Sequence, residues 1–432
     1  MSKVEFSSGE SSVRRRSVWA RLLGVEGAVI EDVEFDEERE ELVATVRPAR
    51  KHRHRCSHCG RRSSRYDRGE GMRRWRALDL GTVKAYVEAE APRVRCKQHG
   101  VVVAAVPWAR RDSGFTRAFE DQAAWLATHS SQSTVSELLR VAWRTVGRIL
   151  ARVSAEAEAK LDRFANLRRI GIDDVAYRKG HRYLVVAFDH DTGRLLWASP
   201  GRDEQTVLSF FDLLGPDRCK KLEFVSCDAA TWISNAVRAR CPQATLCLDP
   251  FHVIAWATRA LDEVRRKVWN DARRSGKRGL ANQLKGSRFA LWKNPEDLTE
   301  RQGAKLSAIA KLNKPLYRAY LLKEQLREVF KLRGDAGIEL LDKWVQWATR
   351  SKLPAFVKVA QAVRKHRAGI DACLRHGLTN ARIEAKNTQL RLLTRQAFGF
   401  HSHEGLIGLA MLKLGGLCPN LPGRQPAHGC GS

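Results

Sequence analysis

The chain has 432 residues, enough for two to four domains of roughly 100–200 residues each. Hydrophobic residues make up 43% of it, which allows folded cores, and 77 Lys and Arg against 48 Asp and Glu give a formal net charge of +29. Met1 to Arg16 lacks the apolar run of an export signal, and no segment approaches the roughly 20 apolar residues that cross a bilayer. The sequence therefore argues against a secreted or membrane-spanning protein.

The excess positive charge runs along most of the chain. Such a charge attracts polyanions, so nucleic acid is the expected partner, and a ribosome-associated or merely basic protein is the alternative. Without an export signal we expect a cytoplasmic protein. In a reducing cytosol, clustered cysteines indicate a metal site rather than disulfides.

Residues 1–16 are rich in Ser, Glu and Arg and are predicted to form a disordered tail. The first predicted domain covers residues 17–112. Alternating apolar and polar residues predict a hairpin over 29–46 with a charged turn at 36–38, and a second pair of strands over 73–95.

Potential metal ligands flank this second pair of strands at a spacing typical of zinc sites: Cys56, Cys59, Cys96 and His99. Three thiolates and one imidazole suit tetrahedral Zn²⁺, so we predict a structural zinc site. His54 and His58 are alternative histidine ligands nearby. The interpretation without a metal site is that some of these cysteines are ordinary free thiols.

Residues 113–162 are predicted to form a helical DNA-binding domain. Apolar residues recur at helical spacing from about residue 116, with a break at 131–133, and again up to Val153. Ser133 is suited to cap the helix that follows the break. The segment from Gln132 is typical of a helix-turn-helix, whose second helix would bring Arg144 and Arg148 to the major groove. A plain helical hairpin is the alternative.

Short apolar strands alternate with helices over residues 163–250. The strands are predicted at 170–172, 183–188, 194–198, 222–227 and 244–248, and the helices at 204–214 and 231–240. The early strands can pair as hairpins and the later ones need crossover helices, which predicts a mixed α/β sheet. Residues 251–375 show no strand pattern and are expected to form an all-helical insertion. A helix follows over 380–393, and residues 417–432 are expected to be a loose tail.

Asp173 and Asp228 each end a short apolar strand, where sites assemble in α/β sheets. Two carboxylates about 4 Å apart repel by on the order of 4 kcal/mol at an effective dielectric constant near 20, and a divalent cation removes this repulsion. Spacing alone does not exclude the adjacent Asp174 as the carboxylate of the site. The alternative is that strand-end aspartates only cap helices or form turns.

A third carboxylate, Glu384, lies on a predicted polar helix face with Asn380, Asn387 and Arg391, while Ile383 and Leu390 point elsewhere. Two divalent ions held by three carboxylates can catalyse an in-line displacement at phosphorus. A polar stripe of this kind is otherwise just the solvated face of a helix.

Five segments resemble the ISL3 family of bacterial insertion-sequence transposases, in the right order and within a match over roughly 50–415. They read IGIDDVAYRKG from Ile170, VSCD from Val225, DPFHV from Asp249, TNARIEAKN from Thr379 and TRQAFGF from Thr394. The sequence departs from the family in having Asp174 for the usual Glu, Ala381 for the usual Gly, and His99 for the usual last cysteine of the zinc site.

The resemblance implies a ribonuclease-H-like core over 163–250 and 376–416, with Asp173, Asp228 and Glu384 as the catalytic triad holding two Mg²⁺ or Mn²⁺ ions. It implies supporting roles for Asp249, His252, Asn380 and Asn387; the alternative for Asp249 and His252 is a structural cap with a packed histidine. Basic residues of these motifs, and Arg391 on the same helix face as Glu384, would contact DNA: Arg178, Lys179, Lys386, Arg391 and Arg395.

The expected function is transposition: binding of the terminal inverted repeats, DNA cleavage and joining of the 3′ ends to target DNA, by at least a dimer associated with the nucleoid. The alternatives are a catalytically inactive, transposase-derived regulator and a nuclease of the same fold.

Overall fold

The computed structural model describes residues 2–3, 18–178, 180–378, 381–396 and 402–424. Contacts divide the chain into two compact units, one of residues 1–162 with 392–432 and the other of residues 163–391. The sequence-based division differs, because it placed residues 376–416 together in the catalytic core. The predicted disorder of residues 1–16 is wrong for Ser2–Lys3 (β1), which form a strand paired with Glu34 and Phe35. Residues 1 and 4–16 lie outside the described residues.

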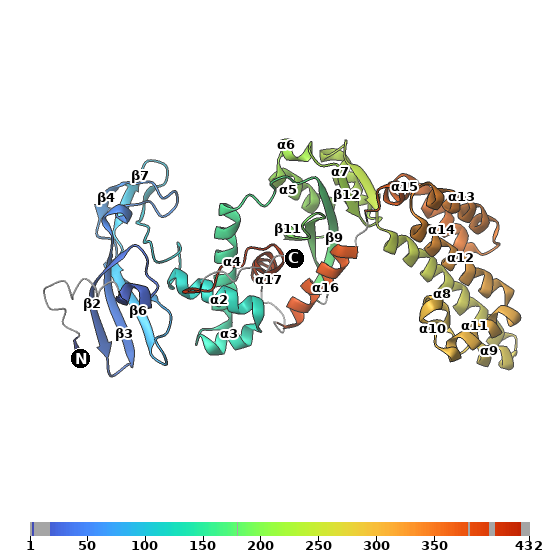
Figure 1. The fold of residues 1–432 in the computed structure, drawn as a ribbon, viewed down its shortest axis with the longest axis horizontal. Helices are drawn as coiled ribbons and strands as arrows, with labels where there is room; N and C mark the ends of the chain where they lie inside the picture. The colour runs from blue at the N-terminus through green and yellow to red at the C-terminus, as the bar shows by residue number, and fades with distance from the viewer. Residues whose placement is uncertain (1, 4–17, 179, 379–380, 397–401, 425–432) are drawn as a thin grey trace. The chain divides into compact units, whose positions relative to one another are not determined.

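The N-terminal part of the first unit consists of two small sheets (Figure 1). The five-stranded sheet has the order β1-β2-β3-β6-β5, and the three-stranded sheet the order β4-β7-β8. The strands are β2 (Ala28–Asp36), β3 (Glu41–Pro48), β4 (Ser64–Asp67), β5 (Met72–Arg76), β6 (Lys84–Glu90), β7 (Arg93–Cys96) and β8 (Gly100–Val103). The predicted hairpin is β2–β3, and the second predicted pair is β5–β6, with β7 separated from β6 by Ala91 and Pro92.

The first unit also contains the helices α2 (Arg117–His129), α3 (Gln132–Leu138), α4 (Trp143–Lys160) and α17 (His403–Leu414). A turn of four residues joins α3 to α4, as a helix-turn-helix requires. The hydroxyl of Ser131 caps α3 by accepting from the N–H of Thr134, so the prediction of Ser133 as the cap is wrong. Gly408 of α17 lies against the backbone of Leu150 and Ala151, so the apolar C-terminal helix packs directly on α4.

The second unit contains a five-stranded sheet with the order β11-β10-β9-β12-β13. Its strands are β9 (Arg169–Arg178), β10 (Arg182–Asp189), β11 (Leu195–Pro200), β12 (Phe224–Cys227) and β13 (Thr245–Leu248). The first three are antiparallel, whereas β12 is parallel to both β9 and β13. Apolar faces of α5 (Glu204–Leu214) and α7 (Thr231–Arg240) pack on the sheet, as the crossover connections predict. The mixed α/β prediction is confirmed.

The segment after β13 is helical, as predicted. The helices are α8 (Pro250–Arg274), α9 (Arg278–Leu284), α10 (Arg288–Trp292), α11 (Glu300–Leu312), α12 (Lys314–Leu332), α13 (Gly334–Arg350), α14 (Pro354–Lys365) and α15 (Arg367–His376). These helices gather into one bundle (Figure 1). They share one hydrophobic core that includes Trp344 and Phe356. Helix α15 packs against β13, and α16 (Ala381–Gln396) then brings the chain back to β9.

Candidate active site and metal centre

Three aspartates lie near the carboxyl ends of β12 and β13 and beside the point where β9 stops pairing with β12. The prediction that Asp173 ends a strand is wrong, because β9 continues past it to Arg178 and pairs there with β10. Asp173 is on β9, Asp228 follows β12 and Asp249 follows β13. The parallel register places Asp228 level with Asp173, and the N–H of Asp249 donates to the carbonyl of Cys227 at 3.0 Å. Adjacent parallel strands therefore deliver the three carboxylates to neighbouring positions.

Asp173 is held from two directions. The side-chain amide of Asn387 donates to its Oδ2 at 2.6 Å, and the backbone N–H of Asp174 donates to its Oδ1 at 2.8 Å. Burial and the negative charge of Asp228 raise the pKa of Asp173 to about 6, against the opposing hydrogen bond from Asp174. The repulsion between Asp173 and the nearby Asp228 favours a cation between them.

The neighbouring Asp174 has a different partner. Its Oδ2 lies 3.1 Å from Nε of Arg202, which follows β11. Burial raises the pKa of Asp174, and the Arg202 guanidinium opposes that rise. The two adjacent aspartates are thus distinguished by their contacts, since α16 engages Asp173 and an arginine neutralises Asp174.

Asp228 and Asp249 differ in how they use their carboxylates. Oδ1 of Asp228 accepts a hydrogen bond from the N–H of Ala230 at 2.9 Å. This is the turn-forming contact expected if the aspartate after a strand has only a structural role. Asp249 is buried and does not cap α8; instead Nδ1 of His252 lies 3.0 Å from its Oδ2. The hydrogen bond to Asp249 raises the pKa of His252, and the charges of Asp228 and Asp173 raise it further.

Helix α16 places Glu384 on the Asp249 side of this edge. Burial raises the pKa of half-buried Glu384, as does the charge of Asp249, while His252 and Arg391 lower it. The predicted polar stripe is wrong in one respect: Asn387 is 1% exposed and lies on the buried face with Ile383 and Leu390. That burial is what lets its amide reach Asp173.

The three predicted catalytic carboxylates are not gathered around one point. In the described part of the chain, one group of three or more His, Cys, Asp or Glu side chains has its ligand atoms close enough for a single metal ion. That group is the cysteine cluster of the two small N-terminal sheets, which we call the N-terminal module. The sheet edge brings Asp173 and Asp228 together, and Glu384 stands beside Asp249 and His252.

The predicted basic contacts are scattered over the described residues. Arg178 at the end of β9 is exposed, as are Arg391 and Arg395 on α16, and Lys386 is half-buried near Gly193. Lys179 and Asn380 lie outside the described residues. Arg144 and Arg148 are exposed on α4, where they line a cavity of about 370 Å³ together with Ser402, Glu404 and Gly405 at the start of α17.

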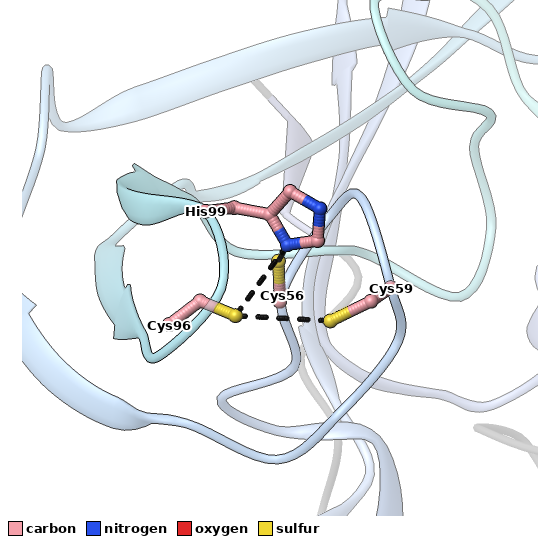
Figure 2. Close-up of side chains that lie close together, drawn as sticks. All are labelled: Cys56, Cys59, Cys96 and His99. Atoms are coloured by element: carbon pink, nitrogen blue, oxygen red, sulfur yellow. Dashed lines mark hydrogen bonds between the residues drawn. The ribbon is translucent and has the colours of Figure 1, made fainter.

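Cys56, Cys59, Cys96 and His99 converge in the N-terminal module, with all four ligand atoms within 4.8 Å of one another (Figure 2). The Sγ atoms of Cys59 and Cys96 are 3.7 Å apart, and Nδ1 of His99 lies 3.7 Å from Sγ of Cys56 and 3.6 Å from Sγ of Cys96. A tetrahedron with Zn–S bonds of about 2.3 Å has edges of about 3.8 Å, so the donor set fits zinc.

The position of His99, and not that of His58, completes the set of zinc ligands. His58 stacks on the ring of His99 with centroids 4.8 Å apart, and its Nδ1 lies 2.9 Å from Nη1 of Arg111. The backbone N–H of Gln98, followed by the ring of His99, lowers the pKa of the Cys96 thiol to about 6, which favours the thiolate that metals bind. The four residues predicted from spacing are those that the fold assembles.

Gly171 is a site-positioning residue that the sequence patterns did not single out. A Cβ at this position would lie 1.7 Å from Cδ1 of Ile383 and 3.0 Å from Oγ of Ser226. Its lack of a side chain lets α16 dock on β9 two residues before Asp173. The available signal was an isolated glycine within a strand, which often marks a close approach of another element.

Comparisons with known proteins match three consecutive parts of the chain. Residues 52–99 match the zinc-finger of transposases IS204, IS1001, IS1096 and IS1165, residues 104–154 the helix-turn-helix domain of transposase family ISL3, and residues 170–408 a transposase family of the same group. No described helix is long and apolar enough to cross a membrane.

Curated relatives cover nearly the whole chain. The transposase for insertion sequence element IS1557 of Mycobacterium tuberculosis, found in two strains, is 54% identical over 96% of this chain and 98% of its own length. The transposase for insertion sequence element IS1001 of Bordetella parapertussis is 27% identical over 90% of this chain and 96% of its own length.

Proposed function

Because this chain belongs to the ISL3 family of insertion-sequence transposases, we propose that it binds the ends of a mobile element, cleaves phosphodiester bonds there and joins the freed 3′ ends to target DNA. The observation that carries the proposal is that Asp173 on β9 lies level with Asp228 after the adjacent parallel strand β12, with Glu384 returning on α16.

The five-stranded sheet of the second unit, with α5 and α7, is proposed to belong to a ribonuclease-H-like core. Three antiparallel strands followed by two parallel strands, in the order β11-β10-β9-β12-β13, support that assignment. The proposed domains are a zinc-binding module over 17–112, a helix-turn-helix domain over 113–162, the core over 163–250 and 376–416, and a helical insertion over 251–375, with tails at 1–16 and 417–432.

The proposed cofactor of the core is a pair of Mg²⁺ or Mn²⁺ ions held by Asp173, Asp228 and Glu384. Bound divalent ions would activate the attacking oxygen and stabilise the leaving oxygen. Hard cations prefer carboxylate oxygens, and the repulsion between Asp173 and Asp228 gives this edge an affinity for positive charge. Asn387 would orient Asp173, and Asp249 would fix the ring of His252 toward the scissile DNA.

The proposed reaction has two stages. Hydrolysis at the element end leaves a 3′-hydroxyl, which then attacks a target phosphodiester so that one P–O bond forms as another breaks. Arg144 and Arg148 are proposed to contact the element end; Arg178, Lys179, Lys386, Arg391 and Arg395 are proposed to contact DNA near the core, with Asn380 in a supporting role. Because two ends must be joined together, we expect at least a homodimer in the DNA complex.

Replacing Asp228 with Asn tests this function. With a supercoiled donor plasmid that carries the element's terminal repeats, the variant should lose Mg²⁺-dependent cleavage by more than a hundredfold and still bind the repeats. The exposed Asp217 on α6 (Pro216–Cys219) provides a matched control, because its change to Asn leaves the sheet edge intact.

Three outcomes separate the candidate functions. Cleavage and strand transfer by the wild-type protein support the transposase. Cleavage without strand transfer would indicate a nuclease, and binding without cleavage a regulator derived from a transposase. Full cleavage by the Asp228 variant would overturn the assignment of the site.

A further inference from the structure

A basic cleft lies directly beside the zinc site in the N-terminal module. It has a volume of about 600 Å³ and is lined by Arg61, Arg62, Ser63, Ser64, Arg95, Cys96, Lys97 and Gln98. The zinc ligand Cys96 is therefore also part of the cleft wall. Four cations and no carboxylate line it.

The zinc site brings the two cation-bearing segments together. Arg61 and Arg62 follow Cys59 in the first ligand pair, whereas Arg95 and Lys97 flank Cys96 in the second. The backbone supports the same arrangement, since Ser64 of β4 is paired with Arg95 of β7. Metal binding and the shape of the cleft are consequently linked.

The cleft cations lack acidic partners in the described part of the chain. Arg61, Arg62, Arg95 and Lys97 are exposed, and none of them pairs there with an Asp or Glu carboxylate. Arg93, two residues before Arg95, differs because its guanidinium pairs with Asp67. Like charges held this close repel one another, and a bound polyanion relieves that repulsion.

One aromatic ring extends the basic surface. Arg95 lies over the ring of Tyr66, with its guanidinium carbon 5.0 Å from the ring centroid, and Tyr66 is 48% exposed. Stacking on a ring fixes the guanidinium plane without neutralising its charge. Arg95 is therefore oriented and still available to an anion.

We propose that this cleft binds the phosphate backbone of double-stranded DNA, and that zinc maintains it. The inference rests on the proposed binding of DNA ends and adds a specific site, separate from the helix-turn-helix. Guanidinium groups bind phosphate oxygens in bidentate fashion, and the hydroxyl of Ser64 and the side-chain amide of Gln98 add neutral donors. Such contacts set affinity and register rather than sequence choice.

The test compares two double variants of the full-length, zinc-loaded protein: Arg62→Gln with Arg95→Gln, and the charge-matched control Arg21→Gln with Arg39→Gln. All four arginines are exposed in the N-terminal module, and the control pair does not line the cleft. Fluorescence anisotropy with a labelled duplex gives Kd at several salt concentrations, and metal analysis verifies that zinc is retained.

We expect the cleft variant to bind DNA about tenfold more weakly and to lower the slope of log K against log salt by about 1.8, because each lost phosphate contact removes about 0.9. The control should change Kd less than about twofold. Equal Kd values and slopes for the two variants would overturn the proposal. A larger loss of affinity and slope in the cleft variant supports it even if the protein never cleaves DNA, so its failure is distinguishable from failure of the proposed function.

A second arm tests the link to zinc and the identity of the polyanion. Cys59→Ser should lose zinc, and adding Arg62→Gln and Arg95→Gln to it should weaken DNA binding no further, since the cleft is already lost. A full additional tenfold loss would overturn the zinc link. Displacement of DNA by poly-aspartate at equal charge concentration would instead point to an acidic protein and overturn DNA as the occupant.

Discussion

The side-chain amide of Asn387 donates a 2.6 Å hydrogen bond to Asp173, joining α16 to β9 at the sheet edge. Asn387 is 1% exposed, so the amide has no route to solvent as an alternative partner. The bond fixes the orientation of one proposed metal ligand from the helix that carries another, Glu384. Both of these proposed ligands therefore depend on how α16 docks.

Asn387→Ala should lower Mg²⁺-dependent cleavage by about 10–100-fold, because loss of an outer-shell partner of a metal ligand typically costs that much affinity or activity. Cleavage rates measured against Mg²⁺ concentration should show a raised Mg²⁺ requirement, with unchanged binding to the terminal repeats. Thr388→Ala, on the exposed side of the same helix, is the control. An unchanged Mg²⁺ requirement would show that Asn387 does not position Asp173.

Gly171→Ala should destabilise the protein by about 1–3 kcal/mol, as overpacking of a tight contact does. The added Cβ would lie 1.7 Å from Cδ1 of Ile383, so the Ile383 side chain must leave its place against β9, which weakens the docking of the helix that carries Glu384. Urea unfolding and cleavage assays should both register the change. Ile383→Ala should be less harmful in the Gly171→Ala background than in the wild type. Strictly additive effects would argue against this contact as the cause.

Asp173→Asn should stabilise the protein at neutral pH when no divalent ion is present. The folded-state pKa of Asp173 is about 6, above the ordinary 3.8, so its contribution favours the folded state at low pH and is lost as pH rises from 4 through 6. The difference corresponds to at most about 3 kcal/mol. Thermal unfolding in EDTA should show a higher Tm for the variant at pH 7.5 and little difference at pH 4.

Added Mg²⁺ should reverse that order, because the wild type gains stability from the bound ion and the variant does not. A variant that is less stable than the wild type at pH 7.5 in EDTA would contradict the electrostatic account of this site.

The zinc site should hold one ion per chain, and its ligand set can be tested at the histidines. His99→Ala should lose zinc, whereas His99→Cys should retain it, since a thiolate at the same corner completes a tetrahedral set of four thiolates. His58→Ala should retain zinc because His58 stacks on His99 without joining the cluster. Metal content by mass spectrometry measures all three. Zinc loss in the His58 variant with retention in His99→Ala would reverse the assignment.

Much of this protein could be predicted from its sequence because the signals are local. Alternating residues predicted the β2–β3 hairpin, and helical spacing predicted the helix-turn-helix and the helical insertion. Paired spacing identified all four zinc ligands. The end of an apolar strand marked Asp228, because the residue after a buried strand is where a polar group first becomes tolerable. The same reasoning pointed to Asp173, although β9 continues past it to Arg178.

Other features were decided by contacts between distant segments, which periodicity does not encode. Helix spacing placed Asn387 on a polar stripe, but docking on β9 buries it next to Asp173. Alternation along a strand places Asp173 and Asp174 on opposite faces, but only the tertiary structure shows that α16 engages the first and Arg202 the second. Likewise, nothing local indicates that α17 packs on α4, since an apolar helix specifies that it will be buried but not against which surface.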